Sequence, residues 1–135
     1  MIDSLENELG FFSVNAKGTV RSWDNNMSAM LGYASSEIVG QSMELLIPKS
    51  YRERHWRGFL EAMSRGATKH DQPALNVPFR HKDGHLALHP AREILLRNAF
   101  GSPVGVVAIV SSACVLGEEN GLPSPYSDAF ELADQ

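Results

Sequence analysis

The stretch SYRERHWRGFLEAMSRG, residues 50–66, predicts the longest helix of the chain and organises the rest of the domain. Ser50 and Glu53 have the spacing of a capping box, in which each residue satisfies a backbone N–H at the start of a helix. Gly66 is the typical residue just past a helix end. The helix should therefore run over about residues 50–65.

One face of this helix should pack on the rest of the domain. The apolar side chains that recur at helical spacing are Trp56, Phe59, Leu60 and Met63. The charged side chains that should mostly cover the outside are Arg52, Arg54, Arg57 and Glu61. His55 lies one turn before Phe59, at the border of the apolar face, so its imidazole should point toward the interior. Gly58, on the same side, costs about 1 kcal/mol relative to alanine in a helix, which suggests that something flat lies close to it.

The residues before this helix predict a hairpin followed by short helical pieces. Two short apolar runs, LGFFSV at 9–14 and GTVRSW at 18–23, are separated by NAKG, and Asn and Gly are common in hairpin turns. The segments NNMSAMLGY and SSEIVG then each have the start and stop residues of a single helical turn, and the following segment MELLIP ends at a proline.

Three strands should follow the helix. The runs ALNVPFRH, HLALHPAREILLR and VGVVAIVSS are separated by the turn KDG and the loop NAFGSP, which is the pattern of an antiparallel set. Pro78 and Pro90 lie inside these runs, and proline has no N–H to donate, so each should mark a sheet edge or a bulge.

Composition narrows the class of protein. The chain has 135 residues, a net charge of −4 and no long basic block, which argues against nucleic acid as a partner. Five acidic residues and no basic residue fall in 117–135. A single cysteine, Cys114, forms no internal disulfide, and the first thirty residues lack a signal-peptide pattern, so we expect a soluble protein in the cytoplasm. Cys114 ends an apolar run, where a thiol is usually a small buried group.

Common catalytic and metal-binding motifs are missing from the sequence. There is no glycine-rich phosphate loop after a strand, no CxxC pair and no HExxH motif, and the five histidines do not have the spacing of a zinc site. Function must therefore be sought in a pocket of the fold.

The order of elements, with W…LGY…EIVG…IP and KDG before a long strand, resembles the PAS domain family. The residues that carry this resemblance are Trp23, Leu31, Gly32, Tyr33, Glu37, Gly40, Pro48, Lys82, Asp83 and Gly84. The resemblance implies an α+β PAS fold over residues 9–113, with a five-stranded antiparallel sheet, helices packed on one face and a ligand cavity between them. Residues 114–135 would form an acidic tail, and Cys114 lies too late in the chain for a flavin-reactive cysteine.

The segment IPKSYRERHWRGF is similar to the helix that carries the iron ligand in haem PAS oxygen sensors. This resemblance implies that the chain binds haem b and that His55 ligates the iron, with Trp56 and Phe59 burying the porphyrin. It also implies a cation near the haem propionates, for which the loop after the helix offers Arg65, Lys69 and His70. The alternative for His55 is a histidine that is simply hydrogen-bonded at the border of the core.

The strands on the other side of the expected haem differ from those of the oxygen sensors. Where those sensors carry an arginine or a methionine, this chain has Pro73 and Leu75. On the next strand, His89, Ala91 and Glu93 share one face, and Leu86 and Leu88 share the other. We favour a bulge at Pro90 that turns the two leucines inward; the alternative is a polar pocket that contains Ala91 and Glu93.

A polar pocket would permit catalysis. His89 would then donate or accept a proton and Arg92 would hold an anion. In layout alone the chain is similar to the haem PAS N-nitroglycine lyases, so a haem enzyme that degrades a small polar nitro compound is a second hypothesis. The first is a haem-binding sensor that acts through a separate signalling protein, and the third is a cofactor-free interaction module.

The first eight residues predict self-association. Ile2, Leu5 and Leu9 form an apolar stripe on an otherwise acidic segment. We expect residues 1–8 to form a short helix that packs against its mate in a homodimer.

Overall fold

The computed structural model describes residues 8–66 and 75–117. Its strands are β1 (Leu9–Asn15), β2 (Val20–Trp23), β3 (Leu75–Arg80), β4 (Leu86–Arg97), β5 (Pro103–Ser111) and β6 (Val115–Gly117). Its helices are α2 (Asn25–Leu31), α3 (Ser35–Ile38) and α4 (Arg52–Arg65), with 3-10 turns η1 (Met43–Leu46) and η2 (Lys49–Tyr51) before α4. The predicted order of two strands, short helical pieces, one long helix and three strands is confirmed.

The strands form one antiparallel sheet in the order β2-β1-β5-β4-β3. This is the five-stranded sheet that we predicted, and the fold class is α+β. The short strand β6 pairs with the first residues of β4 and lies off this path. The sheet therefore extends past residue 113, into the part of the chain that we had expected to be a tail.

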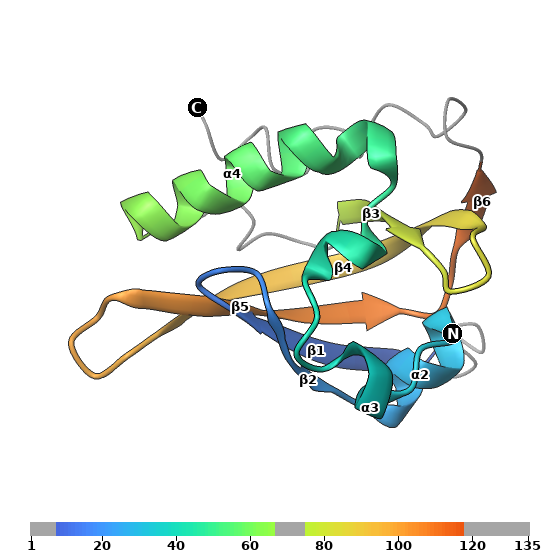
Figure 1. The fold of residues 1–135 in the computed structure, drawn as a ribbon, viewed down its shortest axis with the longest axis horizontal. Coiled ribbons are helices and arrows are strands. Elements are labelled where there is room, and N and C mark those ends of the chain that lie inside the picture. Colours follow the sequence, from blue (N-terminus) through green and yellow to red (C-terminus); the bar gives the residue numbers. More distant parts are fainter. Residues whose placement is uncertain (1–7, 67–74, 118–135) are drawn as a thin grey trace.

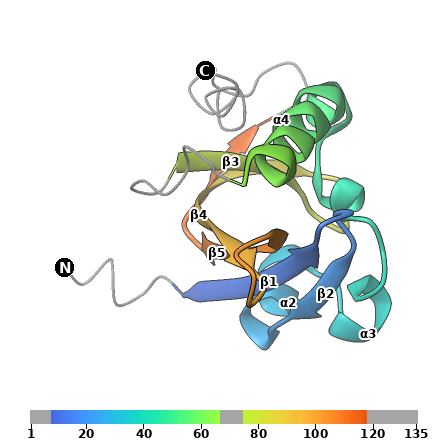
Figure 2. The same ribbon diagram turned by 90° about the vertical axis from the view of Figure 1, so that its left-hand side faces the viewer.

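The helices cover one face of the curled sheet (Figures 1 and 2). Helix α4 runs across the sheet on the β3 side, while α2 and α3 lie near β1 and β2. The main core fills the space between these layers, and its most deeply buried members include Val20, Met27, Leu31, Ile38 and Phe59. This layered arrangement leaves the other face of the sheet uncovered by any described helix.

Helix α4 differs from its prediction at its start and on its surface. Its N-cap is Tyr51 rather than Ser50, because the 3-10 turn η2 takes up the preceding residues, whereas Gly66 ends it in the left-handed conformation as expected. Leu60 is exposed at 56%, so it does not face the core. Trp56, Phe59 and Met63 pack on the core and Gly58 is buried, as predicted, so Leu60 is the one member of the predicted stripe that departs from it.

Pro90 lies in β4 without a bulge. The pairing of β4 with β3 keeps one register from Leu75↔Ala91 to Arg80↔Leu86. On the other side of β4, the pairing with β5 begins at Ala91 and the pairing with β6 ends at Leu88. Pro90 falls in the gap between these two partners, so its missing N–H leaves no ladder bond unmade. The bulge that we favoured is wrong.

No helix in the described parts of the chain is long and apolar enough to span a membrane.

Candidate ligand cavity

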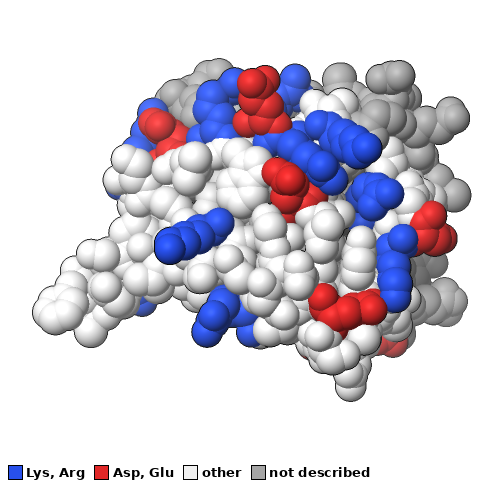
Figure 3. All heavy atoms as spheres, viewed as in Figure 1, with Lys and Arg blue, Asp and Glu red and all other residues white. Residues whose placement is uncertain are grey.

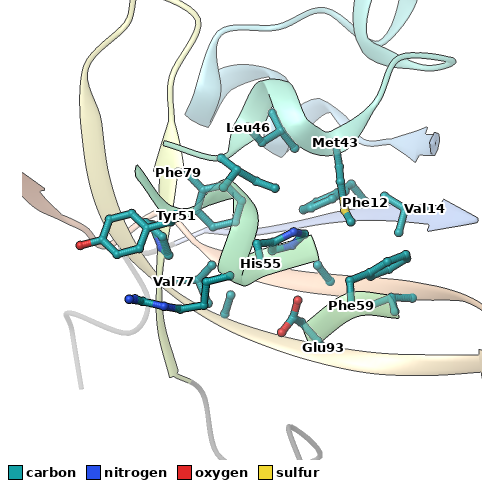
Figure 4. Close-up of a pocket in the computed structure, with 16 residues that line it drawn as sticks. Phe12, Val14, Met43, Leu46, Tyr51, His55, Phe59, Val77, Phe79 and Glu93 are labelled. Atoms are coloured by element: carbon teal, nitrogen blue, oxygen red, sulfur yellow. The ribbon is translucent and has the colours of Figure 1, made fainter. Parts of the chain in front are cut away.

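A cavity lies between α4 and the sheet (Figure 4). Its volume is about 70 Å³, which is room for a small molecule or a few waters. Strands β1, β3, β4 and β5, the turn η1 and helix α4 all contribute to its wall. The charged or titratable lining residues besides Tyr51 are Arg54, His55 and Glu93, and the rest of the lining is apolar. The site is therefore an apolar pocket with a few polar groups that converge on it.

His55 projects from α4 into this cavity, as we predicted (Figure 4). Its ring stacks on Phe59 with ring centroids 6.2 Å apart, and meets Trp56 edge to face at 5.7 Å. Burial lowers the pKa of His55 to about 3. The imidazole is therefore neutral at physiological pH, and one ring nitrogen keeps the lone pair that a ligand or a metal ion requires.

Glu93 reaches the same cavity from β4 (Figure 4). Burial raises the pKa of its carboxyl to about 8, so the group holds a proton at neutral pH. No hydrogen bond or ion pair links Glu93 to another residue within 8–66 or 75–117. Glu93 is only partly buried, and a carboxyl that faces a largely apolar cavity without such a partner is a candidate contact for a ligand.

Arg54 also lines the cavity, although we had expected it to cover the outside of the helix. Its guanidinium lies over the ring of Tyr51, 5.5 Å from the ring centroid, in cation–π geometry. Figure 3 shows Lys and Arg side chains gathered over α4. The helix thus places positive charge beside the cavity.

The other residues of the haem hypothesis take varied positions. Phe59 lines the cavity, but Trp56 does not, and its indole N–H donates to Glu44 Oε1 at 2.9 Å. The Trp56 ring packs on Gly18, whose positive φ of 83° and tight contact both exclude a larger residue. Arg65 forms an exposed ion pair with Glu61 at 2.7 Å, away from the cavity. The two other proposed propionate contacts, Lys69 and His70, lie outside the described residues.

Ala91 and Glu93, which were predicted on an opposing strand, line the cavity. They do so because the continuous register through Pro90 turns this face of β4 toward α4. The backbone of Leu75 pairs with Ala91 at the start of β3. Leu86 and Leu88 pack with Tyr51 in a separate small cluster. The polar alternative for this pocket is therefore the one that the register supports.

The two predicted catalytic side chains lie elsewhere. Arg92 is exposed and points to the opposite side of β4 from Ala91 and Glu93, because adjacent residues of a strand alternate between faces. His89 is only 1% exposed and sits behind Phe79, with its ring edge to face at 5.6 Å. Phe79 lines the cavity and His89 does not. The acid–base and anion-binding roles that we expected for this pair have no support in this arrangement.

His89 belongs instead to a histidine cluster with His81 and His85, at the closed end of the β3–β4 hairpin. His89 Nδ1 donates to Ser111 O at 2.8 Å, because a carbonyl only accepts. The neutral ring then accepts at Nε2 from His81, 3.0 Å away. Burial, followed by repulsion from the neighbouring histidines, lowers the pKa of His81 to about 4. The described residues form no group that could hold a metal ion.

Several cavity residues were missed from the sequence. They come mainly from β1, η1, β3 and β5, and include Phe12, Met43, Val77, Phe79 and Val106. Their alternation along the strands predicted burial, but did not distinguish a cavity wall from packed core. Cys114 is also exposed rather than buried, because it lies in the turn between β5 and β6.

The comparisons with known proteins agree with this architecture. The family described as the PAS fold matches residues 8–111. A PAS domain from Colwellia psychrerythraea is 17% identical, with a TM-score of 0.65 over 76% of this chain and 83% of that one. The PAS-B domain of Drosophila melanogaster Cycle, solved with bound ethylene glycol, is 14% identical, with a TM-score of 0.60 over 79% and 98%. The fungal blue-light photoreceptor Vivid is 13% identical, with a TM-score of 0.57 over 76% of each chain.

The search of curated proteins gave no significant match. Since the family match covers most of the chain, this protein belongs to the PAS family. The solved structures are too distant in sequence to show more than the fold.

Proposed function

We propose that this chain is a PAS sensor module that binds a small molecule in the cavity between α4 and the sheet. The observation that carries this proposal is the pair of polar groups that enter an apolar cavity from opposite sides: His55 from α4 and Glu93 from β4. Both groups are uncharged at neutral pH. Such groups orient a ligand that the apolar wall encloses. A bound ligand would contact both the helix and the sheet, since each supplies one polar group, so binding would affect the position of both.

The more specific hypothesis is that the ligand is haem b, held through His55. In its favour, His55 is a neutral buried imidazole, which is a common axial ligand, and aromatic and aliphatic side chains surround it. Against it, a cavity of about 70 Å³ holds only a few waters and does not accommodate a porphyrin. Haem therefore requires α4 to move away from the sheet. When bound, haem would supply an iron that takes small gaseous or anionic ligands.

A titration of the purified chain with hemin, followed by absorption spectroscopy, tests the haem hypothesis. If α4 moves to admit haem, the wild type should show a Soret band, and so should the matched control His85→Ala, which changes an exposed histidine outside the cavity. His55→Ala should lose the band and should regain part of it when imidazole is added. No band in the wild type would exclude haem and leave a smaller ligand.

The wider proposal has its own test. Small organic probes should shift the amide resonances of cavity residues in NMR spectra of the wild type. If hemin and the probes all fail to bind, the chain is the cofactor-free interaction module of the third hypothesis. The lyase hypothesis is not pursued, because neither His89 nor Arg92 lines the cavity.

We also propose that the chain forms a homodimer through the uncovered face of the sheet. Phe11, Ile94 and Leu96 lie on this face and are 45%, 38% and 37% exposed. An apolar surface of this kind favours a protein partner, and a second copy is the simplest one. The expected helix at the N-terminus lies almost wholly outside the described residues. Sedimentation of the full chain measures the association.

A further inference from the structure

Glu93 is an acidic side chain with an unusual setting. It enters the cavity from β4, on the side opposite His55, and shares the cavity wall with Phe59, Ala91 and Val106 (Figure 4). Among residues 8–66 and 75–117 it has no hydrogen-bond or ion-pair partner. Its side chain is only partly buried, and it lines the cavity. A carboxyl in a largely apolar wall is therefore placed to bond a partner that enters the cavity.

The charge state of this carboxyl follows from its surroundings. An ionised carboxylate in an apolar site without a cation costs more free energy than the neutral acid, so the group keeps its proton. The raised pKa of Glu93 agrees with this. A neutral carboxylic acid differs from a carboxylate in one respect that matters here, since its O–H can donate a hydrogen bond.

The other polar groups of the cavity decide which ligand suits this donor. Arg54 lies in the same wall and carries a fixed positive charge, which disfavours a cationic ligand. The apolar lining disfavours any ion that is not paired. A cavity of about 70 Å³ limits the ligand to a small molecule. The remaining class is a small uncharged molecule with an acceptor oxygen, such as a ketone or an amide.

We propose that Glu93 selects the ligand of this cavity by donating a hydrogen bond to an acceptor oxygen of a small uncharged molecule. This inference rests on the proposed function, because it takes the cavity to be a binding site. It adds the chemical class of the ligand and the residue that distinguishes it from a hydrocarbon of the same shape.

Three probes of nearly the same size test the selection. Cyclopentanone has an acceptor oxygen, methylenecyclopentane replaces that oxygen by a carbon, and cyclopentylamine is a cation at neutral pH. NMR titrations of the full chain should show that cyclopentanone binds the wild type about three- to tenfold more tightly than methylenecyclopentane, which is the usual effect of one neutral hydrogen bond. Cyclopentylamine should bind most weakly.

Two variants of Glu93 and one control assign the preference to this residue. Glu93→Gln keeps an N–H donor and should keep the preference for the ketone, whereas Glu93→Leu should lose or reverse it. Glu61→Gln changes an acid on the outer side of α4 and should behave like the wild type. Retention of the preference in Glu93→Leu, or tightest binding of the amine to the wild type, would overturn the inference.

The failure of this inference can be told apart from failure of the proposed function. If the wild type binds ketone and hydrocarbon equally, the cavity is a binding site but Glu93 does not select its ligand. If no probe binds the wild type, both proposals fail. An infrared difference spectrum between wild type and Glu93→Gln gives a readout that needs no ligand. It should show a protonated carboxyl at neutral pH, and a carboxylate band there would also overturn the inference.

Discussion

Two regions of the domain hold polar side chains away from bulk solvent: the ligand cavity and the histidine cluster. They differ in the hydrogen bonds that these side chains make. In the cluster, His89 lies between Ser111 O and His81, so both of its ring nitrogens have partners within the protein. In the cavity, Glu93 has no such partner among the described residues. Burial lowers the pKa of both His55 and His89, so a lowered pKa alone does not distinguish the two settings. The hydrogen bonds of His89, and the lack of any for Glu93 among the described residues, do distinguish them, and they are the basis of our proposal that the cavity binds a ligand.

The largest expected effect is a difference in stability between two histidine variants. His89→Leu removes the partner of Ser111 O and of His81, and each buried group left unsatisfied costs about 1–3 kcal/mol. We therefore expect a loss of about 3 kcal/mol in the free energy of unfolding. His55→Leu places an apolar side chain in a largely apolar cavity wall, and should cost less stability than His89→Leu.

Urea unfolding of both variants beside the wild type measures this difference. Equal losses would mean that His55 is as firmly part of the fold as His89. The contrast between the two regions would then fail for His55.

The two regions should also respond to pH with opposite signs. The pKa of Glu93 is raised from 4.5 to about 8, so unfolding releases its proton within that window, and its contribution to stability falls as pH rises. The pKa of His81 is lowered from 6.5 to about 4. Its contribution is complete above pH 6.5 and is lost as pH falls toward 4.

The variant Glu93→Gln isolates the contribution of Glu93 to the pH dependence of stability. Glu93→Gln cannot ionise, so its stability relative to the wild type should rise between pH 4.5 and pH 8. The expected rise is about 2 kcal/mol. A shift from 4.5 to about 8 would give about 5 kcal/mol at about 1.4 kcal/mol per pKa unit, and solvent access to the cavity reduces this. Urea unfolding across this pH range measures it, and Glu61→Gln should show a constant difference. A constant difference for Glu93→Gln as well would show that Glu93 is ionised in the folded chain.

Most of the fold could be predicted from local sequence. Turn residues such as those of NAKG, and Gly66 after the long helix, mark ends of elements because few other residues adopt those conformations. Strand β6 was missed because three residues carry too little pattern. Leu60 and Arg54 were assigned to the wrong sides of α4 because both lie at borders of its apolar face, where a small rotation of the helix decides burial.

The site was predictable only in part. The position of His55 beside the apolar stripe indicated a side chain that faces the interior, and this is confirmed. The sequence left two alternatives for this strand: a bulge at Pro90 that turns Leu86 and Leu88 inward, or a polar pocket that contains Glu93. The second, which we did not favour, is correct. The choice depended on whether Pro90 faces a strand partner, and that is decided by where β5 ends and β6 begins. Such a gap between strands is a property of the assembled sheet and not of the residues around Pro90.

The smallest expected effect concerns coupling inside the histidine cluster. The ring of His85 lies 3.9 Å from that of His81, centroid to centroid, and is exposed beside Asp83. Burial is the main cause of the lowered pKa of His81, and repulsion from His85 is the next. His85→Gln removes this second cause only. It should raise the pKa of His81 by less than about one unit, while the free energy of unfolding stays within about 0.5 kcal/mol of the wild type, as for most surface changes.

NMR titration of the histidine ring protons measures both His81 and His55 in one experiment. His55 should not respond, because no cause of its lowered pKa other than burial is resolved. A response of His55 that matches that of His81 would show that the two regions are electrostatically connected, and would remove the distinction between a cluster that serves the fold and a cavity that serves a ligand.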